Sequence, residues 1–179
     1  MENNRRSFLK KLGLTTGAAA LAPSFLAEAN TINQEYITRT GGFSADQPIR
    51  LALIGAGIMG TEDTNTALRH ENVSLVAVCD LYDGRLASAK QKWGDHLFLT
   101  KDHKEILKRA DVDAVIIGTP DHWHQPISIA ALEAGKHVYC EKPMTLDAAT
   151  TAALIDTAAR RRVLLMEAFM YRCHPLIAE

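Results

Sequence analysis

Three glycines with a characteristic spacing are the strongest chemical signal in this sequence. Gly55, Gly57 and Gly60 follow a short apolar run in the order Gly-x-Gly-x-x-Gly. At a strand–turn–helix junction, the first glycine permits a sharp turn, the second lets a pyrophosphate approach the main chain, and the third lets the helix pack against the strand. The N–H groups that begin such a helix face phosphate oxygens, and here they belong to Ile58 and Met59.

An acidic residue stands where such a site needs one. A second apolar run, 73–79, leads into Asp80, which lies 20 positions after Gly60. A carboxylate at this place accepts hydrogen bonds from the adenosine ribose and repels a 2′-phosphate. The position of Asp80 therefore predicts that NAD is the preferred cofactor and that NADP is less favoured. Arg85 is near enough in the sequence to alter that preference. The alternative is an ordinary tight turn with a solvated Asp80 at a strand end.

The elements that must position these residues alternate along the chain. We expect strands at 51–54, 73–80, 97–99, 114–118, 137–140 and 163–167. We expect helices at 58–70, 83–93, after Asp102 as its N-cap, 126–134 and 147–162. This alternation predicts an α/β fold with a doubly wound parallel sheet, the Rossmann type. Ligands of such sheets bind at the carboxyl ends of the strands.

Composition narrows the class of protein. The 179 residues are 47% hydrophobic and 23% charged, as expected of one globular domain with a real core. The net charge of −1 gives no broad basic field for nucleic acid. Cys79, Cys140 and Cys173 have no zinc-finger spacing, and two of them sit in or beside apolar runs, which indicates buried free thiols.

The amino terminus has the features of an export signal. Arg5-Arg6-Ser-Phe-Leu-Lys resembles a twin-arginine motif, and the apolar run 12–26 is short for a membrane span. We expect a signal peptide at 1–29 and a flexible linker at 30–48. The expected partner is the twin-arginine export machinery, and the expected location is the periplasm, with the folded chain carrying its cofactor. An uncleaved membrane anchor and an amphipathic first helix are the alternatives.

Two further loops are expected at the same edge of the sheet. Thr119-Pro-Asp-His-Trp-His124 follows the fourth strand, and Glu141-Lys-Pro143 follows the fifth. His122 and His124 have an His-x-His spacing, but no third ligand is suitably placed, so we predict no metal. Trp123 has the chemistry to stack on a cofactor or to pack in the protein.

Taken together, these motifs resemble the Gfo/Idh/MocA oxidoreductases, the glucose–fructose oxidoreductase and inositol dehydrogenase family. The resemblance covers about 48–175 and is carried by the glycine turn, Thr119-Pro-x-x-x-His124, 131–138, Glu141-Lys-Pro143 and 167–175. It implies hydride transfer between a nicotinamide and a hydroxyl-bearing carbon of a sugar, cyclitol or polyol. It also implies that 49–170 is the NAD(P)-binding domain.

The resemblance assigns roles to the two loops. Lys142 matches the family lysine that hydrogen-bonds the reacting oxygen, where an ammonium can stabilise a developing alkoxide. Glu141 would place the nicotinamide or Lys142, or serve only as a salt-bridge partner. The remaining cofactor-binding assignments are Thr119, Pro120 and His124, the last of which contacts cofactor or orders its loop.

Relatives of this kind continue into a second domain, a largely antiparallel sheet with the sugar pocket and the homo-oligomer surface. We expect 171–179 to begin the connection to it, and an exposed patch where it would dock. The second family domain is absent from this chain, so we expect a fragment or a lone nucleotide-binding domain. An NAD-dependent glycosidase on the same scaffold and a non-catalytic dinucleotide-binding module are the other functions considered.

Overall fold

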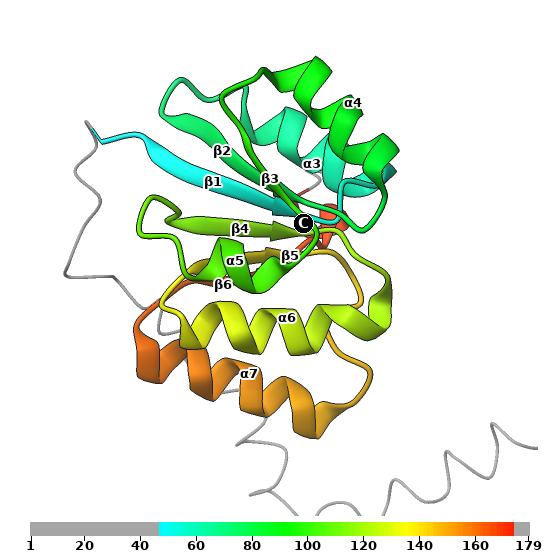
Figure 1. Ribbon diagram of the computed structural model, residues 1–179. Coiled ribbons are helices and arrows are strands. Elements are labelled where there is room, and N and C mark those ends of the chain that lie inside the picture. Colours follow the sequence, from blue (N-terminus) through cyan, green and yellow to red (C-terminus); the bar gives the residue numbers. More distant parts are fainter. Residues whose placement is uncertain (1–46, 174–179) are drawn as a thin grey trace, which may run out of the picture. The chain divides into compact units, whose positions relative to one another are not determined.

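The computed structural model describes residues 47–173 of the chain. Strands and helices alternate through this range (Figure 1). The elements are β1 (Ile49–Ile54), α3 (Ile58–Ala67), β2 (Val73–Cys79), α4 (Asp83–Trp93), β3 (Phe98–Thr100), α5 (His103–Leu107), β4 (Ala114–Ile117), α6 (Asp121–Glu133), β5 (His137–Cys140), α7 (Ala148–Arg161), β6 (Leu165–Glu167) and the 3₁₀ helix η2 (Met170–Cys173). The expected signal peptide, nearly all of the expected linker and residues 174–179 lie outside the described residues.

The six strands form one parallel sheet in the order β3-β2-β1-β4-β5-β6. The order reverses beside β1, because the chain runs outward through β2 and β3 and then returns to place β4 on the other side of β1. This reversal opens a crevice at the carboxyl ends of β1 and β4, where open α/β sheets bind ligands. The predicted fold class is confirmed.

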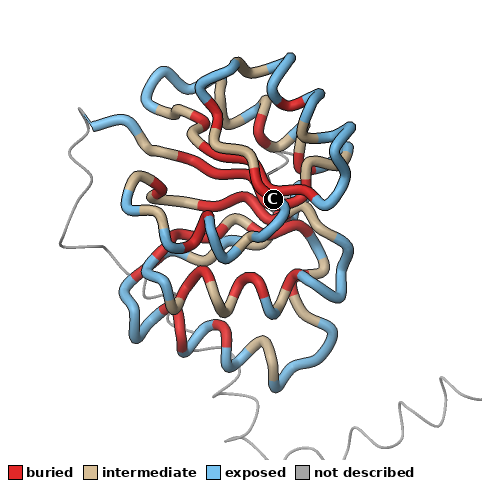
Figure 2. Tube along the Cα trace, viewed as in Figure 1, coloured by how far each residue is buried: buried red, intermediate tan, exposed pale blue. Residues whose placement is uncertain are grey.

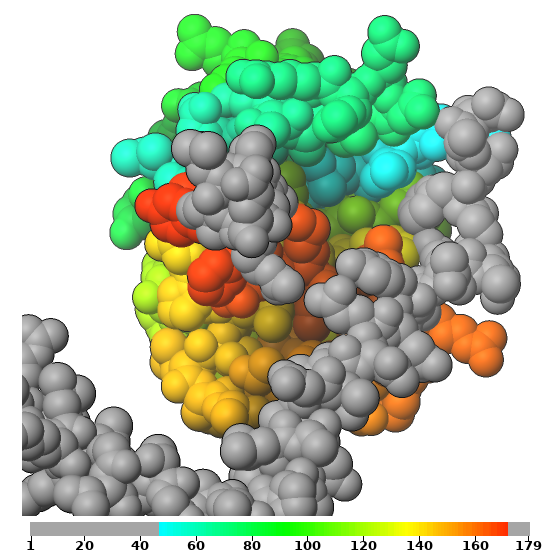
Figure 3. All heavy atoms as spheres, turned by 180° about the vertical axis from the view of Figure 1, so that it is seen from behind, coloured from blue at the N-terminus to red at the C-terminus, as the bar shows by residue number. Residues whose placement is uncertain are grey.

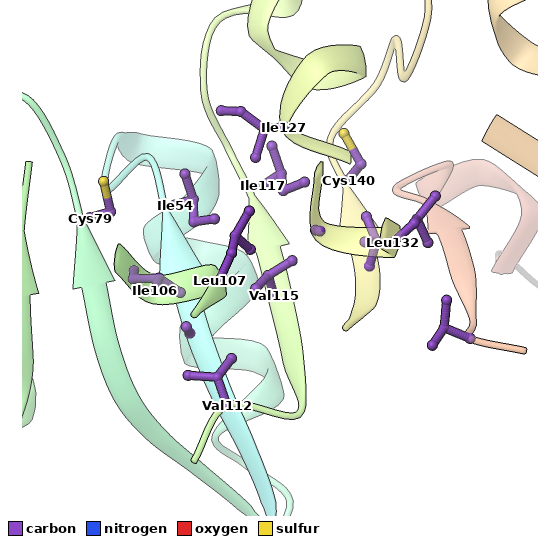
Figure 4. Packing of buried hydrophobic residues seen from close by; sticks show 14 of the residues in the cluster. Ile54, Cys79, Ile106, Leu107, Val112, Val115, Ile117, Ile127, Leu132 and Cys140 are labelled. Atoms are coloured by element: carbon purple, nitrogen blue, oxygen red, sulfur yellow. The ribbon is translucent and has the colours of Figure 1, made fainter. Parts of the chain in front are cut away.

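Helices cover the sheet from both sides, and the core has two parts. Ala52 and Ile54 of β1 pack in a large cluster with residues of α5, α6 and α7 (Figure 4). Leu51 and Leu53 point to the opposite face, into a smaller cluster that includes residues of α3 and α4. Burial is concentrated in the central strands (Figure 2). β1 is therefore covered on both faces, which explains its unbroken apolar sequence.

The structure corrects the predicted start of one helix. We expected Thr119–His124 to be a loop and a helix to begin at Pro126, but α6 begins at Asp121 and includes Pro126 in its interior. Pro120 is the N-cap, with an extended ψ of 149° that leads the chain from β4 into the helix. Proline at the sixth helical position removes one intrahelical hydrogen bond, a cost that burial of this helix against the sheet outweighs. The other predicted elements are present, with ends shifted by a few residues.

An apolar surface lies at and after the last strand. Leu164, Met166, Phe169, Met170 and Tyr171 are each about half exposed or more. Seen from behind, the orange and red residues of this region reach the surface (Figure 3). These residues form an exposed apolar patch, and its role as the docking surface of a further domain stays a prediction. Within 47–173, no helix is long and apolar enough to cross a membrane.

Candidate functional site

The glycine turn forms a close contact between three backbone segments. Gly55 has φ +93°, and a Cβ there would lie 2.7 Å from the backbone of Gly118 at the end of β4. A Cβ on Gly118 would lie 2.7 Å from the Cα of Gly60. A Cβ on Gly60 would in turn overlap the carbonyl oxygen of Gly55. The first and third glycines thus act as predicted, because each allows an approach that alanine would block.

The second glycine has open space in front of it. The nearest atom to a Cβ on Gly57 would be Nη1 of Arg85, at 3.9 Å. Gly57 is the N-cap of α3, and no side chain caps the helix or places an acid in its first turn. Ile58, the first residue of α3, is 84% exposed. The arrangement leaves room for a pyrophosphate at an uncapped helix N-terminus.

Asp80 lies at the crevice but does more than the sequence predicts. Its carboxylate accepts hydrogen bonds from the backbone N–H groups of Ala56 (2.8 Å) and Tyr82 (2.9 Å). It also pairs with Nη1 of Arg85 at 3.3 Å, and its side chain is only 4% exposed. A carboxylate offers about four lone-pair positions, so one is left for a ribose hydroxyl. Asp80 therefore braces the glycine turn from the neighbouring strand, and this explains its position as well as ribose binding does.

A cavity of about 370 Å³ runs along the carboxyl ends of the strands. Gly55, Asp80, Thr119 and Pro120 all line it, so the structure brings four of the predicted cofactor residues to one hollow. The hydroxyl oxygen of Thr119 is buried and has no hydrogen-bond partner. A buried hydroxyl without a partner is costly, and a bound molecule that offered it a hydrogen bond would remove that cost. The glycine turn thus offers room for a phosphate, and this hydroxyl offers a hydrogen bond to a bound molecule.

Trp123 and two histidines form the outer wall of this cavity. Trp123 is 45% exposed, and its ring centroid lies 6.0 Å from His122 and 6.3 Å from His103. The described residues contain no group of three or more His, Cys, Asp or Glu that could hold a metal ion. The three rings form an aromatic surface at this wall, and the absence of a metal stays a prediction.

Lys142 is exposed on a loop whose backbone is fixed at several points. Its own N–H donates to Oε2 of Glu141 at 3.0 Å, and Glu141 is only 6% exposed. The next peptide bond, to Pro143, is cis. The N–H of Met144 donates to Oε1 of Glu167 at 2.8 Å. The hydrogen bonds to Glu141 and Glu167 thus hold the loop backbone around Lys142, which follows the carboxyl end of β5 beside that of β4.

His124 ties this loop to the start of α6. Nδ1 lies 2.8 Å from the carbonyl oxygen of Pro143, and Nε2 lies 2.7 Å from that of Thr119. The side chain is 1% exposed. Both ring nitrogens are engaged, so of the two roles predicted for His124 the geometry supports loop ordering over contact with cofactor.

Sequence reasoning missed Asp63 and Glu167. Asp63 lies on α3, and its carboxyl group interacts with Glu141; burial first, then the charge of Glu141, raises its pKa to about 6. A sequence signal for Asp63 existed. It stands three positions after Gly60, so it lies on the helix face that packs toward the sheet. Glu167 begins the family-like stretch 167–175, but its contact with Met144 depends on how β6 pairs with β5, so the sequence did not indicate this role.

The two described cysteines are poor candidates for chemistry. Cys79 and Cys140 are buried free thiols at the ends of β2 and β5. Burial raises the pKa of each to about 12, so neither forms a nucleophilic thiolate near neutral pH. This agrees with their prediction as structural residues.

A parallel sheet with a reversed strand order, an open glycine turn and an acid on the neighbouring strand define a dinucleotide-binding domain. Comparison with known proteins narrows this class. Residues 49–169 match the family described as "Oxidoreductase family, NAD-binding Rossmann fold". The chain belongs to this family, Gfo/Idh/MocA, and the matched region is its NAD-binding oxidoreductase domain.

The relatives include enzymes of two kinds. Inositol 2-dehydrogenase 1 of Saccharopolyspora erythraea is 33% identical over 129 residues, which are 71% of this chain and 38% of the relative. Alpha-N-acetylgalactosaminidase of Shewanella oneidensis is 31% identical over 183 residues, covering 94% of this chain and 40% of that protein. The chain thus spans about two fifths of the length of these curated relatives.

Solved structures give the same picture. Scyllo-inositol dehydrogenase from Lactobacillus casei, with bound NAD(H) and scyllo-inositol, superposes with a TM-score of 0.66 at 29% identity. The match covers 72% of this chain and 38% of that one. The family and these neighbours support NAD as the cofactor.

Proposed function

We propose that this chain supplies the nucleotide-binding part of an NAD-dependent oxidoreductase acting on a hydroxyl group of a sugar, cyclitol or polyol. The observation that carries the proposal is that the glycine turn, Asp80 and the Lys142 loop follow the carboxyl ends of β1, β2 and β5 in one parallel sheet, with the glycine turn bonded to Asp80. The inositol dehydrogenases among the relatives support the substrate class.

Each group in the crevice has a part in this function. The N–H groups at the start of α3 bind the pyrophosphate, and Asp80 binds the adenosine ribose with its remaining lone pair. Bound NAD supplies the hydride acceptor. The Lys142 ammonium holds the reacting oxygen and stabilises negative charge as it develops there, an effect that a rigid loop strengthens because no reorganisation is needed.

The decisive experiment is a calorimetric titration of the chain with NAD, using Gly57→Ala as the probe. A methyl group at Gly57 meets only the tip of Arg85, so the fold should tolerate it, yet the methyl occupies the space that the pyrophosphate needs. We expect an affinity loss of about tenfold or more, which corresponds to about 1.4 kcal/mol.

Gly84→Ala is the control, because Gly84 lies in the first turn of α4 and has nothing within 4 Å of its Cβ position. It should bind NAD as the parent does. Equal affinity of the Gly57→Ala variant and the parent would contradict the site, and failure of the folded parent to bind would contradict the function.

Cofactor preference is tested at Asp80. Asp80→Asn keeps the size of the side chain and an oxygen for the Ala56 N–H, but it removes the charge. The variant should therefore close part of the gap between NAD and NADP affinity, while Arg85 becomes free to contact a 2′-phosphate. An unchanged ratio of the two dissociation constants would show that Asp80 serves only to brace the turn.

A second function is supported by the similarity to alpha-N-acetylgalactosaminidase, which extends over 94% of this chain. In that case bound NAD would serve a glycosidase without net oxidation. The two functions separate in one assay of the protein with candidate polyols and glycosides. Accumulation of NADH supports the oxidoreductase, and glycoside cleavage without NADH supports the glycosidase. NAD binding without either reaction would favour a non-catalytic module.

We also propose that the chain is exported by the twin-arginine route, on the evidence of Arg5 and Arg6. Replacing both with lysine should retain the protein in the cytoplasm in a fractionation experiment. An unchanged distribution would contradict this route.

A further inference from the structure

A second cavity, of about 360 Å³, lies between α3 and α4. The glycine turn, from Ala56 to Ile58, lines one side of it. The other side is lined by α4, through Arg85, Ser88 and Lys92 among others. These three residues are spaced three and four positions apart, so they lie on one face of the helix. Arg85 also lines the cavity at the strand ends described above, so the two cavities adjoin at this residue.

The lining of the second cavity carries more positive than negative charge. Arg85 and Lys92 are its cations, and Glu62 of α3 is its acid, which leaves one positive charge in excess. Glu62 accepts a hydrogen bond from the side chain of Asn65 at 3.4 Å. Ser88 adds a hydroxyl group to the lining. A guanidinium, an ammonium and a hydroxyl are the side-chain groups that bind phosphate oxygens, so the cavity suits a phosphate monoester.

Lys92 has no acidic partner in the structure. Its Nζ lies 5.4 Å from the centroid of the Trp93 ring, and within 47–173 it forms no salt bridge. Lys90, two positions earlier on the same helix, pairs with Asp95 at 3.5 Å and does not line the cavity. The lysine that faces the cavity is therefore free to pair with a bound anion.

Arg85 connects this cavity to the place where the adenosine ribose binds. Its Nη1 lies 3.3 Å from Oδ2 of Asp80, and it would lie 3.9 Å from a Cβ on Gly57. Asp80 is the expected partner of a ribose hydroxyl, and Gly57 marks the place of the pyrophosphate. A phosphate on the ribose hydroxyl beside Asp80 would therefore lie within reach of Arg85, at the entrance of the second cavity.

We propose that this cavity is a phosphate subsite for the adenosine end of the cofactor, and that the chain takes NADP as a second, weaker cofactor. Arg85 turns from Asp80 to the 2′-phosphate, and the Lys92 ammonium and the Ser88 hydroxyl complete the subsite. The inference rests on the proposed function, since its ligand is a nicotinamide dinucleotide.

Asp80 disfavours NADP in this arrangement but does not exclude it. Its carboxylate keeps the hydrogen bonds from the N–H groups of Ala56 and Tyr82 when Arg85 leaves, so part of its charge stays compensated. The 2′-phosphate then gains the contacts with Arg85 and Lys92. We therefore expect the dissociation constant of NADP to lie within about a hundredfold of that of NAD, which corresponds to about 2.8 kcal/mol.

The test is calorimetric titration of the chain with NAD and with NADP, comparing the parent with Lys92→Ala and Lys90→Ala. Lys92→Ala should weaken NADP binding by about tenfold, because it removes a charge-assisted contact with the 2′-phosphate, and should leave NAD binding unchanged. Lys90→Ala is the matched control, since it removes the same charge from the same helix outside the cavity. It should leave both affinities unchanged.

Two further measurements use the same titration. Asp80→Asn should strengthen NADP binding, and adding Lys92→Ala to that variant should remove most of the gain. In the parent, raising the salt concentration from about 0.05 M to about 0.5 M should weaken NADP binding more than NAD binding, because the 2′-phosphate adds ion pairs that salt screens. The salt series needs no substitution, so it tests the subsite even if a variant does not fold.

Each other outcome contradicts a stated part of the argument. Saturable NAD binding without NADP binding would overturn the subsite and leave the proposed function standing. Equal weakening of NAD and NADP by Lys92→Ala would place the shared pyrophosphate in the cavity and overturn the inference. Equal effects of Lys90→Ala and Lys92→Ala would reduce the effect to net charge and overturn it too. Failure of the folded parent to bind either dinucleotide would overturn the proposed function and this inference with it.

Discussion

Replacing Gly60 with alanine should push α3 away from the sheet and lower the free energy of unfolding. The structure allows this loss to be estimated. A Cβ there would overlap the carbonyl oxygen of Gly55 and lie 3.0 Å from a methyl group of Leu53. The Gly55 oxygen belongs to the backbone of a tight turn and cannot turn aside. Overpacking of this kind costs about 3 kcal/mol or more, and alanine returns about 1 kcal/mol of helix propensity. The net loss should be about 2 kcal/mol or more.

The measurement is urea unfolding of the chain followed by circular dichroism, with Gly84→Ala as the reference. Both changes convert a helical glycine to alanine, but Gly84 has open space around it and should gain about 0.5–1 kcal/mol. Subtracting the change in unfolding free energy of Gly84→Ala from that of Gly60→Ala cancels the contribution of helix propensity. The remainder is the packing cost at Gly60. If the Gly60→Ala variant were as stable as Gly84→Ala, the close packing of Gly55, Gly60 and Gly118 would not contribute to stability as argued.

Three further changes test single contacts. Folding raises the pKa of Asp63 from 3.8 to about 6, so the native state binds the extra proton in this window and loses stability as the pH rises through it. Asp63→Asn should therefore raise Tm most at pH 8, less at pH 5 and not at all below the unfolded pKa of 3.8, and an equal gain at pH 8 and pH 5 would contradict the shift. Thr119→Val removes a buried hydroxyl without a partner, so the free energy of unfolding should rise by up to about 1 kcal/mol. Calorimetry should show weaker NAD binding by the same variant. A lower free energy of unfolding would mean that the hydroxyl has a partner. Asp102→Ala removes the N-cap bond to the Lys104 N–H, 2.9 Å long, and should cost about 1 kcal/mol in urea unfolding, whereas Asp102→Ser should recover most of it.

The local part of the site could be predicted from sequence because its causes are local. The apolar run before Gly55, the spacing of the three glycines and the position of Asp80 each have a physical reason that acts within a few residues. The parallel sheet could be predicted for the same reason, since a buried parallel strand such as β4 needs a continuous apolar sequence. These predictions concern which residues can adopt a conformation, and the structure agrees with them.

The start of α6 was mispredicted because its cause is not local. Pro126 is a common helix-start signal, and it concealed the true start at Asp121. The first turn is instead held by His124, whose ring contacts the carbonyl oxygen of Pro143, 19 positions away. Tertiary contacts of this kind override a proline preference and leave no mark in the sequence of the helix.

The support of Lys142 was also beyond sequence reasoning. The acids that act on its loop, Asp63 and Glu167, come from α3 and from β6. Their spacing from Glu141 carries no information until the strand order is known. Sequence motifs identified the loop that bears the ammonium, and only the fold shows what holds that loop in place.

The central place of β1 has a consequence for synthesis. One edge of this strand is completed by β2, but the other edge waits for β4, which begins 60 residues after β1 ends. At about 5–20 residues per second, a ribosome needs about 3–12 s to make that stretch. Through this interval an apolar strand edge is unpaired and open to mispairing with other chains. The ion pair between Arg50 and Asp113, 2.8 Å long, joins the start of β1 to the residue just before β4, so it favours the native register of this late pairing.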